Sequence, residues 1–236
     1  MVPTALSGNV SSRRAASRCT LRFVAAPIAE VTITPDSNAA AVLEALERAR
    51  DTAAAVAVID ACGPLPERFE APADWLRAVT LFELPLVFAF EGEVRGGLAE
   101  LALACDIRVC SEGAALRGRI HSNARAQTLA GEGPALSLFL GQTLDAAALL
   151  AAGLVSTVTP GGDARSEARR MAGVIASRGP IAVRLGKEAI WRGLAQPLEQ
   201  ALRFETDLTL LLQTTKDRAE GVRAFLEKRP PIFTGE

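Results

Sequence analysis

The sequence has a single histidine, His121, and no tyrosine among its 236 residues. A metal site built on two or three histidines therefore cannot form, and hydride-transfer enzymes that depend on a tyrosine acid are excluded. A serine or cysteine hydrolase would have to use His121 as its base, yet the sequence contains no Gly-x-Ser-x-Gly nucleophile motif. The remaining chemistry must use carboxylates, backbone dipoles, lysine, cysteine or arginine.

The sequence also lacks an excess of charge of either sign, a paired cysteine motif and a long apolar run. A formal net charge of −1 gives no electrostatic footprint for nucleic acid or for an acidic membrane surface. The four cysteines show no Cys-x-x-Cys spacing, which indicates a reduced, cytoplasmic protein. No apolar run reaches the roughly 18 residues of a membrane helix. We therefore expect no metal, no nucleic acid and no membrane among its ligands.

The chain is long enough for one domain with a sizeable core. Its first 29 residues contain four arginines and no acidic residue. This composition suits an organelle transit peptide or, more simply, a frayed basic tail. We predict a flexible tail over residues 1–20, a core over 21–177 and a helical C-terminal region over 178–236.

Strand-like and helix-like segments alternate along the first half of the chain, and helices dominate the second half. Apolar runs and turn signals predict strands over residues 21–25, 28–33, 55–59, 86–90, 107–110 and 153–159. Apolar periodicity predicts helices over residues 39–50, 74–79, 96–104, 134–150, 163–177, 180–193 and 197–212, the fourth of them with a break near Gly141. Asp74 is expected to cap the second helix and residues 91–95 to form a turn. Thr214 and Asp217 have capping-box spacing for a last helix that ends near Arg229. The pattern is typical of an α/β protein.

The most informative segment is LVFAFEGEVRGGLAELALACDI, residues 86–107. A buried strand leads through a turn to Gly96 and Gly97, which open a helix. Free N–H groups in the first turn of a helix, together with its dipole, can stabilise a developing oxyanion. Glu100 lies about one turn further on, within reach of a group held there. The structural alternative is a strand–helix crossover whose glycines serve only close packing.

This segment resembles the central signature of the enoyl-CoA hydratase/isomerase, or crotonase, superfamily. Four further segments are similar to the family in the same order, so that the resemblance covers roughly residues 28 to 234: Pro35–Ala39, Leu138–Val158, Pro180–Arg192 and Gly221–Phe233. The resemblance implies a spiral of ββα units followed by helices that mediate trimer formation. It also implies an acyl-coenzyme A thioester as substrate, with coenzyme A as part of the substrate and no separate cofactor. A homotrimer or a dimer of trimers is the expected assembly.

The resemblance also implies roles for individual residues. Gly97 matches a backbone N–H donor that holds the thioester oxygen, and Glu100 matches the first of two glutamates that move protons. Gly96 and Ala39 match positions that line the substrate site. Phe225 and Lys228 match C-terminal positions that reach coenzyme A, often from a neighbouring subunit. Alternatively, Phe225 serves only helix packing and Lys228 is a solvated surface charge.

The chain departs from the family pattern in three places. The stretch that supplies the second oxyanion donor is short and contains prolines, which have no N–H to donate, so that Gly63 and Leu65 remain as candidates. Ile120 stands where the second glutamate is expected, and His121 beside it could replace the missing acid or be an ordinary loop side chain. Arg95 occupies a turn position that is usually uncharged, where it could bind a substrate carboxylate or point to solvent.

Two functions follow from these observations. The first is an acyl-CoA enzyme that stabilises a thioester enolate at Gly97 and uses Glu100 as its acid or base. Loss of the second proton-transfer group should lower the rate by roughly 10²–10⁴. The second is a non-catalytic acyl-CoA binder or a partner subunit of such an enzyme.

Overall fold

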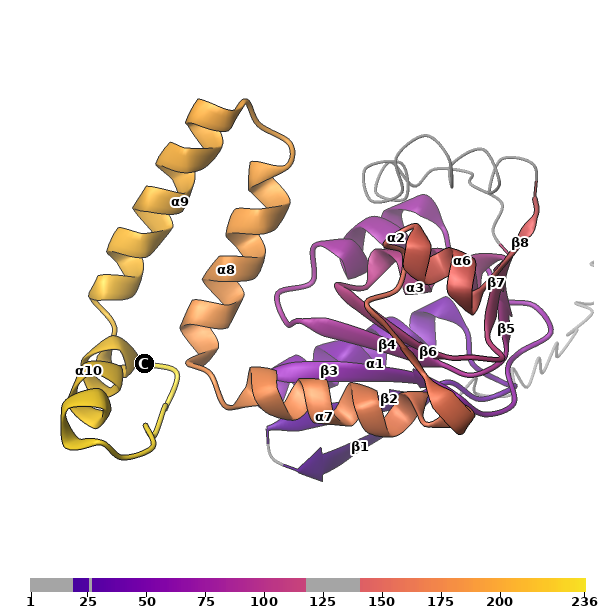
Figure 1. Ribbon diagram of the computed structural model, residues 1–236, viewed down its shortest axis with the longest axis horizontal. Helices are drawn as coiled ribbons and strands as arrows, with labels where there is room; N and C mark the ends of the chain where they lie inside the picture. Colours follow the sequence, from indigo (N-terminus) through magenta and orange to yellow (C-terminus); the bar gives the residue numbers. More distant parts are fainter. Residues whose placement is uncertain (1–18, 26, 118–140) are drawn as a thin grey trace, which may run out of the picture.

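A computed structural model describes residues 19–25, 27–117 and 141–236 (Figure 1). A six-stranded sheet has the order β1-β2-β3-β4-β6-β9. All of its neighbouring strands are parallel except β1 and β2, which form an antiparallel pair. The strands are β1 Thr20–Ala25, β2 Ile28–Thr32, β3 Val56–Ala61, β4 Leu86–Phe90, β6 Ile107–Ser111 and β9 Thr157–Thr159. A second sheet, β5-β7-β8, comprises Glu93–Arg95, Ala115–Arg117 and Thr143–Asp145.

Helices cover both faces of the large sheet, as expected for parallel strands. Four of them share the larger core: α1 Ala39–Asp51, α2 Ala73–Thr80, α3 Gly97–Ala104 and α6 Ala146–Ala151. Helix α7, Ala164–Ala176, covers the other face (Figure 1). Successive strand residues divide between the two faces: Ile59 and Phe88 enter the larger core, whereas Val58 and Ala89 pack against α7. This alternation fixes which side chains can reach α3.

Two buried carboxylates lie on the sheet face that α7 covers. Glu30 on β2 is fully buried and accepts hydrogen bonds from Arg169 at 2.6 and 2.9 Å and from Arg22. Asp60 at the end of β3 is 1% exposed and lies 2.9 Å from Arg165. The two α7 arginines are four residues apart, so they lie on one face of the helix. Glu30 and Asp60 therefore set how α7 docks on the sheet.

The C-terminal region is an arm of three helices, α8 Pro180–Gly193, α9 Leu198–Gln213 and α10 Lys216–Glu227. The antiparallel pair α8 and α9 stands beside the α/β body (Figure 1). Helix α10 follows α9 at the end of the pair where α8 begins, so that Asp217 lies beside Gly179. Asp106, just before β6, joins α8 to the body. Its carboxylate accepts hydrogen bonds from Leu86 N at 2.8 Å and Trp191 Nε1 at 3.0 Å, and lies 2.7 Å from Lys187 Nζ.

The strands and helices predicted from long patterns are confirmed, and five local predictions are wrong at least in part. Pro72, not Asp74, takes the N-cap position of α2, and no side chain caps that helix. Residues 93–95 are a strand rather than part of a turn, because Val94 is buried beside Leu116 of β7. The predicted helix 134–150 breaks as expected near Gly141, which takes φ +67°, but the described part then forms strand β8 before α6 begins at Ala146. Of the predicted strand 153–159, only Thr157–Thr159 pairs, with β6.

The capping-box prediction for the last helix is shifted by one residue. Thr215 rather than Thr214 is the N-cap of α10, since its side chain accepts from Arg218 N. Asp217 instead accepts from the backbone of Thr234 and Gly235 at 2.7 and 2.9 Å. In the described residues, no helix combines the length and hydropathy needed to span a bilayer.

We predict that Glu30→Gln lowers the free energy of unfolding by roughly 1.5–3 kcal/mol at pH 7, the range for hydrogen bonds to a charged group. Burial alone would raise the pKa of Glu30, but the hydrogen bonds from Arg169 and Arg22 outweigh it and hold the pKa below its ordinary 4.5. The stabilisation is therefore complete above pH 4.5 and is lost as the pH falls through the lower folded value. Urea unfolding at pH 7 and at steps down to pH 3 should show the difference between variant and wild type shrinking.

Glu167→Gln is the matched control, since Glu167 pairs with Arg170 on the outer side of α7 at 2.7 Å. A surface pair of this kind contributes little. A difference between wild type and Glu30→Gln that stays constant with pH would contradict the account of Glu30.

Candidate active site

The candidate site forms where the chain leaves the large sheet and begins α3. Strand β4 is buried throughout and is followed by the short strand β5. Gly96 then takes φ +57° and ψ −132°, a conformation that residues with a Cβ rarely adopt, and its N–H donates to Arg117 O at 3.2 Å. The conformation of Gly96 thus turns the chain from strand β5 into α3.

Gly97 is a glycine for a different reason. A Cβ on this residue would lie 2.3 Å from Phe69 O and 2.9 Å from Ala71 N, so that no larger side chain fits. Its N–H, the predicted oxyanion donor, donates to Phe69 O at 3.2 Å. A backbone carbonyl oxygen thus stands in hydrogen-bond contact with the N–H that was expected to bind a thioester oxygen.

Phe69 belongs to the connection between β3 and α2, residues 62–72, which we call the 62–72 segment. Its first residue is tied to the sheet, because Cys62 N donates to Asp60 Oδ1 at 3.1 Å. Further along, Pro66 and Phe69 are buried, and the Phe69 ring contacts Trp75 of α2 edge-on at 5.8 Å. The segment therefore forms one wall of the site. Gly63 and Leu65, the candidates for a second oxyanion donor, both lie in it.

Glu100 lies in the first turn of α3, and its backbone N–H donates to Gly96 O at 3.2 Å. Its side chain is partly buried, so that it is neither sealed in the core nor fully solvated. A carboxylate in the first turn interacts favourably with the helix dipole. Glu100 and Gly97 are three residues apart in one helical turn, which places them on neighbouring parts of the same face.

Arg95 is exposed on β5, and the register of the second sheet puts it beside Arg117 of β7. Two arginines thus adjoin the glycine turn, and no ion pair to either is found within the described ranges. That Arg95 binds a substrate carboxylate, rather than pointing to solvent, stays a prediction. Ile120 and His121, the positions at which the family pattern places a second acid, lie outside the described residues.

The other predicted substrate-binding residues lie far apart along the fold. Ala39 opens α1, whose N-cap Asn38 accepts from Ala41 N at 2.9 Å, and packs partly buried against the larger core. Phe225 of α10 is 82% exposed. Lys228 ends that helix in the left-handed conformation, at φ 55°. Both α10 positions lie on the arm, so the chain does not fold them over its own α3 (Figure 1).

The thiols contribute no reactive group to the site. Burial raises the pKa of the Cys62 thiol, and nearby Asp60 and Glu91 raise it further. Burial also raises the pKa of Cys110 to about 11. Neither thiol is therefore a ready thiolate at neutral pH. Across residues 19–25, 27–117 and 141–236, no group of three or more His, Cys, Asp or Glu side chains is arranged to hold a metal ion.

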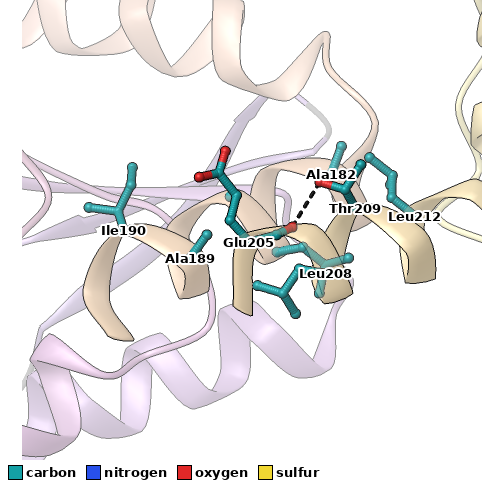
Figure 2. Close-up of a pocket in the computed structure, with 9 residues that line it drawn as sticks. Ala182, Ala189, Ile190, Glu205, Leu208, Thr209 and Leu212 are labelled. Atoms are coloured by element: carbon teal, nitrogen blue, oxygen red, sulfur yellow. Dashed lines mark hydrogen bonds between the residues drawn. The ribbon is translucent and has the colours of Figure 1, made fainter. Parts of the chain in front are cut away.

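A pocket between α8 and α9 is separate from this site. Figure 2 shows that mainly small and apolar side chains line it, among them Ala189, Ile190 and Leu208, with Glu205 at its side. A hydrogen bond from the Thr209 hydroxyl to Glu205 O, at 2.9 Å, closes only a turn of α9. With no cluster of polar side chains, this pocket offers surface for packing rather than chemistry.

Sequence patterns identified Gly96, Gly97 and Glu100, and the structure places all three in one strand–turn–helix unit. They missed Asp60 and the Phe69 carbonyl. Asp60 could have been noticed as a carboxylate at the end of an otherwise apolar strand. The backbone carbonyl of Phe69 leaves no trace in the sequence.

Comparison with known proteins relates this arrangement to a family. Residues 63–236 match the family described as enoyl-CoA hydratase/isomerase. The chain is 34% identical over 167 residues to the probable enoyl-CoA hydratase 2, mitochondrial, of Arabidopsis thaliana, a match that covers 66% of this chain and 56% of the relative. It is 33% identical over 163 residues to the short-chain-enoyl-CoA hydratase of Clostridium acetobutylicum, covering 65% and 62%. The chain thus spans less than two thirds of these relatives.

Solved structures agree with the sequence comparison. The crystal structure of enoyl-CoA hydratase from Bacillus anthracis superposes with a TM-score of 0.81 at 28% identity, covering 93% of this chain and all of the other. The expected fold, a mixed α/β body followed by a helical C-terminal region, is therefore confirmed.

We predict that Gly97→Ala lowers the free energy of unfolding by roughly 1–3 kcal/mol, the range for overpacking a filled site. The added methyl group would overlap Phe69 O, so either the 62–72 segment or the start of α3 must shift. Urea unfolding followed by circular dichroism measures the loss. Gly92→Ala, in the same connection between β4 and α3, is the matched control because its Cβ would meet nothing within 4 Å. Equal stability of the two variants would show that the tight space at Gly97 is unimportant.

Proposed function

The chain belongs to the enoyl-CoA hydratase/isomerase family, and from that membership we propose that it processes acyl-CoA thioesters at the start of α3. The observation that carries the proposal is the hydrogen bond from Gly97 N–H to a carbonyl oxygen at 3.2 Å. It supports a site in which a carbonyl oxygen fits in front of this donor, as a thioester oxygen would have to. Glu100, one turn along, supplies the carboxylate.

The proposed chemistry is proton transfer next to the thioester. Glu100 removes a proton from Cα, the electron pair of that C–H bond moves toward the thioester carbonyl, and the negative charge that develops on its oxygen is held by Gly97 N–H. Return of a proton from Glu100 to Cα or to Cγ completes exchange or double-bond migration. In hydration, water adds its hydroxyl group to Cβ and Cα receives the proton. A preorganised N–H donor is worth roughly 2.7–4 kcal/mol to such a step.

The type of reaction depends on proton-transfer groups beyond Glu100. Isomerisation needs one group that can reach two carbons, whereas hydration gains from a second group that activates water. We propose isomerase-type or hydratase-type chemistry with Glu100 as the principal acid and base. Arg95 and Arg117 beside the glycine turn would favour an acyl chain that carries a carboxylate.

A non-catalytic acyl-CoA binder, or a partner subunit of an enzyme of this family, is the second candidate function. The same hydrogen bond favours it, because Gly97 N–H already has a partner within the chain. The two candidates differ in whether bound esters are converted.

We also propose that the arm assembles the chain into a homotrimer or a dimer of trimers. Large apolar side chains are exposed along its three helices: Ile190, Leu194, Leu198, Leu202, Leu210, Leu211, Phe225 and Leu226. Exposed apolar surface on this scale is typical of an interface. In such an assembly Phe225 and Lys228 would meet coenzyme A bound to a neighbouring copy.

A cytoplasmic location stays a prediction from the cysteine pattern. All four cysteines are free, as expected for a reducing compartment. The Arabidopsis relative carries a mitochondrial name.

For the chemistry, we predict that Glu100→Gln lowers kcat by roughly 10²–10⁴ and leaves ester affinity nearly unchanged, because the amide fills the same space but cannot carry the proton. Turnover is measured on crotonyl-CoA and on a panel of β-hydroxy, β,γ-enoyl and malonyl-type esters, with binding followed by calorimetry. Glu44→Gln, an exposed glutamate on α1, is the control. Bound esters that the wild type does not convert would establish the binder, and full turnover by Glu100→Gln would remove Glu100 from the mechanism.

For the assembly, we predict that the chain sediments at three or six times its 24.8 kDa mass. Leu202→Asp should reduce this mass, because a carboxylate in an apolar interface loses its hydration without gaining a partner. Val174→Asp, at an exposed apolar position on α7, should not. A wild-type chain that sediments as a monomer at micromolar concentration would contradict the proposal.

A further inference from the structure

The Phe69 carbonyl occupies the donor on which the proposed function rests. One N–H group cannot serve Phe69 O and a thioester oxygen equally well, since a shared hydrogen bond is weaker in each branch. The Phe69 carbonyl also packs tightly against this residue, because a Cβ on Gly97 would lie 2.3 Å from Phe69 O. A substrate oxygen that takes the full hydrogen bond of Gly97 N–H must therefore displace Phe69 O.

The 62–72 segment is attached in a way that allows such movement. Within the described residues, backbone groups of this segment are tied to the rest of the molecule by three hydrogen bonds: Cys62 N to Asp60 Oδ1 and Leu76 N to Pro72 O at its two ends, and Gly97 N to Phe69 O between them. Its charged pair, Arg68 and Glu70, faces solvent with side chains 85% and 70% exposed. Segments held by few hydrogen bonds open at low free-energy cost. What holds the segment in place is chiefly the burial of Pro66 and Phe69.

A second observation points to the same place. Trp75, which the Phe69 ring contacts, is 8% exposed, and its indole N–H is buried without a hydrogen-bond partner among the described residues. An unpaired buried donor costs free energy in the conformation where it occurs. The closed arrangement of the 62–72 segment therefore carries an unsatisfied group that a rearrangement could satisfy.

We propose that the 62–72 segment is an internal gate, in which the Phe69 carbonyl occupies Gly97 N–H until an acyl-CoA ester displaces it. The inference rests on the proposed function and deepens it. Binding of the ester exchanges one carbonyl acceptor for another at Gly97, so the hydrogen bond itself is nearly conserved. The free energy that opposes binding comes from exposing the Phe69 side chain. The apparent affinity for the ester is therefore the affinity of the open state multiplied by the fraction of molecules that are open.

Removing the buried Phe69 side chain, which holds the segment closed, should therefore strengthen the binding of the ester. We expect Phe69→Ala to lower the Kd for crotonyl-CoA by about tenfold relative to wild type, because the open fraction rises. Phe82→Ala is the matched control: both phenylalanines are 7% exposed and belong to the same core cluster, but Phe82 lies beyond the other end of α2. Phe69→Leu, which keeps an apolar side chain, is the second variant should the alanine variant fold poorly, and should give a smaller decrease.

The movement can be followed in the same protein by fluorescence. The chain has two tryptophans, and Trp191→Phe leaves Trp75 as the only emitter; Trp191 lies on α8, away from the site. We expect saturating crotonyl-CoA to shift Trp75 emission and raise its quenching by acrylamide, as Phe69 moves off the indole ring.

The outcomes separate the gate from the function on which it rests. Calorimetric binding with unchanged Trp75 emission, or a Kd for Phe69→Ala no lower than that of Phe82→Ala, overturns the gate and leaves acyl-CoA binding standing. Binding by Phe69→Ala but not by wild type would support the gate strongly. Absence of binding by both proteins at millimolar ester would overturn the proposed function, and the gate with it.

Discussion

The narrow space in front of Gly97 is the constraint on which the site depends. Gly96 supplies the positive φ that turns the chain from the second sheet into α3, and Gly97 leaves room for a carbonyl oxygen where a Cβ would collide with it. The two glycines thus serve different physical needs, one conformational and one steric. Together they present an N–H donor at a helix start, with Glu100 a turn away. The hydrogen bond from Gly97 N–H to Phe69 O connects the packing of the 62–72 segment to the proposed chemistry at this donor.

Charges buried at other places hold the rest of the fold around this unit. Glu30 and Asp60 fix α7 against one face of the sheet through Arg169 and Arg165, which leaves the opposite face to α1, α2 and α3. Asp106, two residues after α3, ties the arm to the body. Because Asp106 lies just beyond the last residue of α3, the arm is joined to the body at the end of that helix opposite to the site.

Long patterns made much of this fold predictable. The apolar run of β4 and the proline-to-glycine span of α8 have the bounds that the sequence indicates, 86–90 and 180–193. Strands β5 and β8 escaped prediction because three residues are too few to show a period, and their pairing partner lies elsewhere in the chain. The pairing of Glu30 with Arg169 joins residues 139 positions apart, and no local pattern encodes it.

The candidate site was predictable to the same extent. Gly97 and Glu100 stand out because their spacing combines with a buried strand and matches a family signature. The carbonyl that accepts from Gly97 N–H does not stand out, since every residue of a chain has a backbone carbonyl. Only the path of the 62–72 segment, set by the burial of Pro66 and Phe69, decides which carbonyl reaches the donor.

The central claim is that Gly97 and Glu100 together allow an acyl-CoA ester to exchange a proton at Cα. Incubation with butyryl-CoA in deuterium oxide, followed by mass spectrometry of the recovered ester, tests this directly and needs neither water addition nor a second acid. The account predicts deuterium at Cα with the wild type and at least a hundredfold slower incorporation with Glu100→Gln, the lower limit for loss of a proton-transfer group. Butyryl-CoA that binds to the wild type and acquires no deuterium would contradict it.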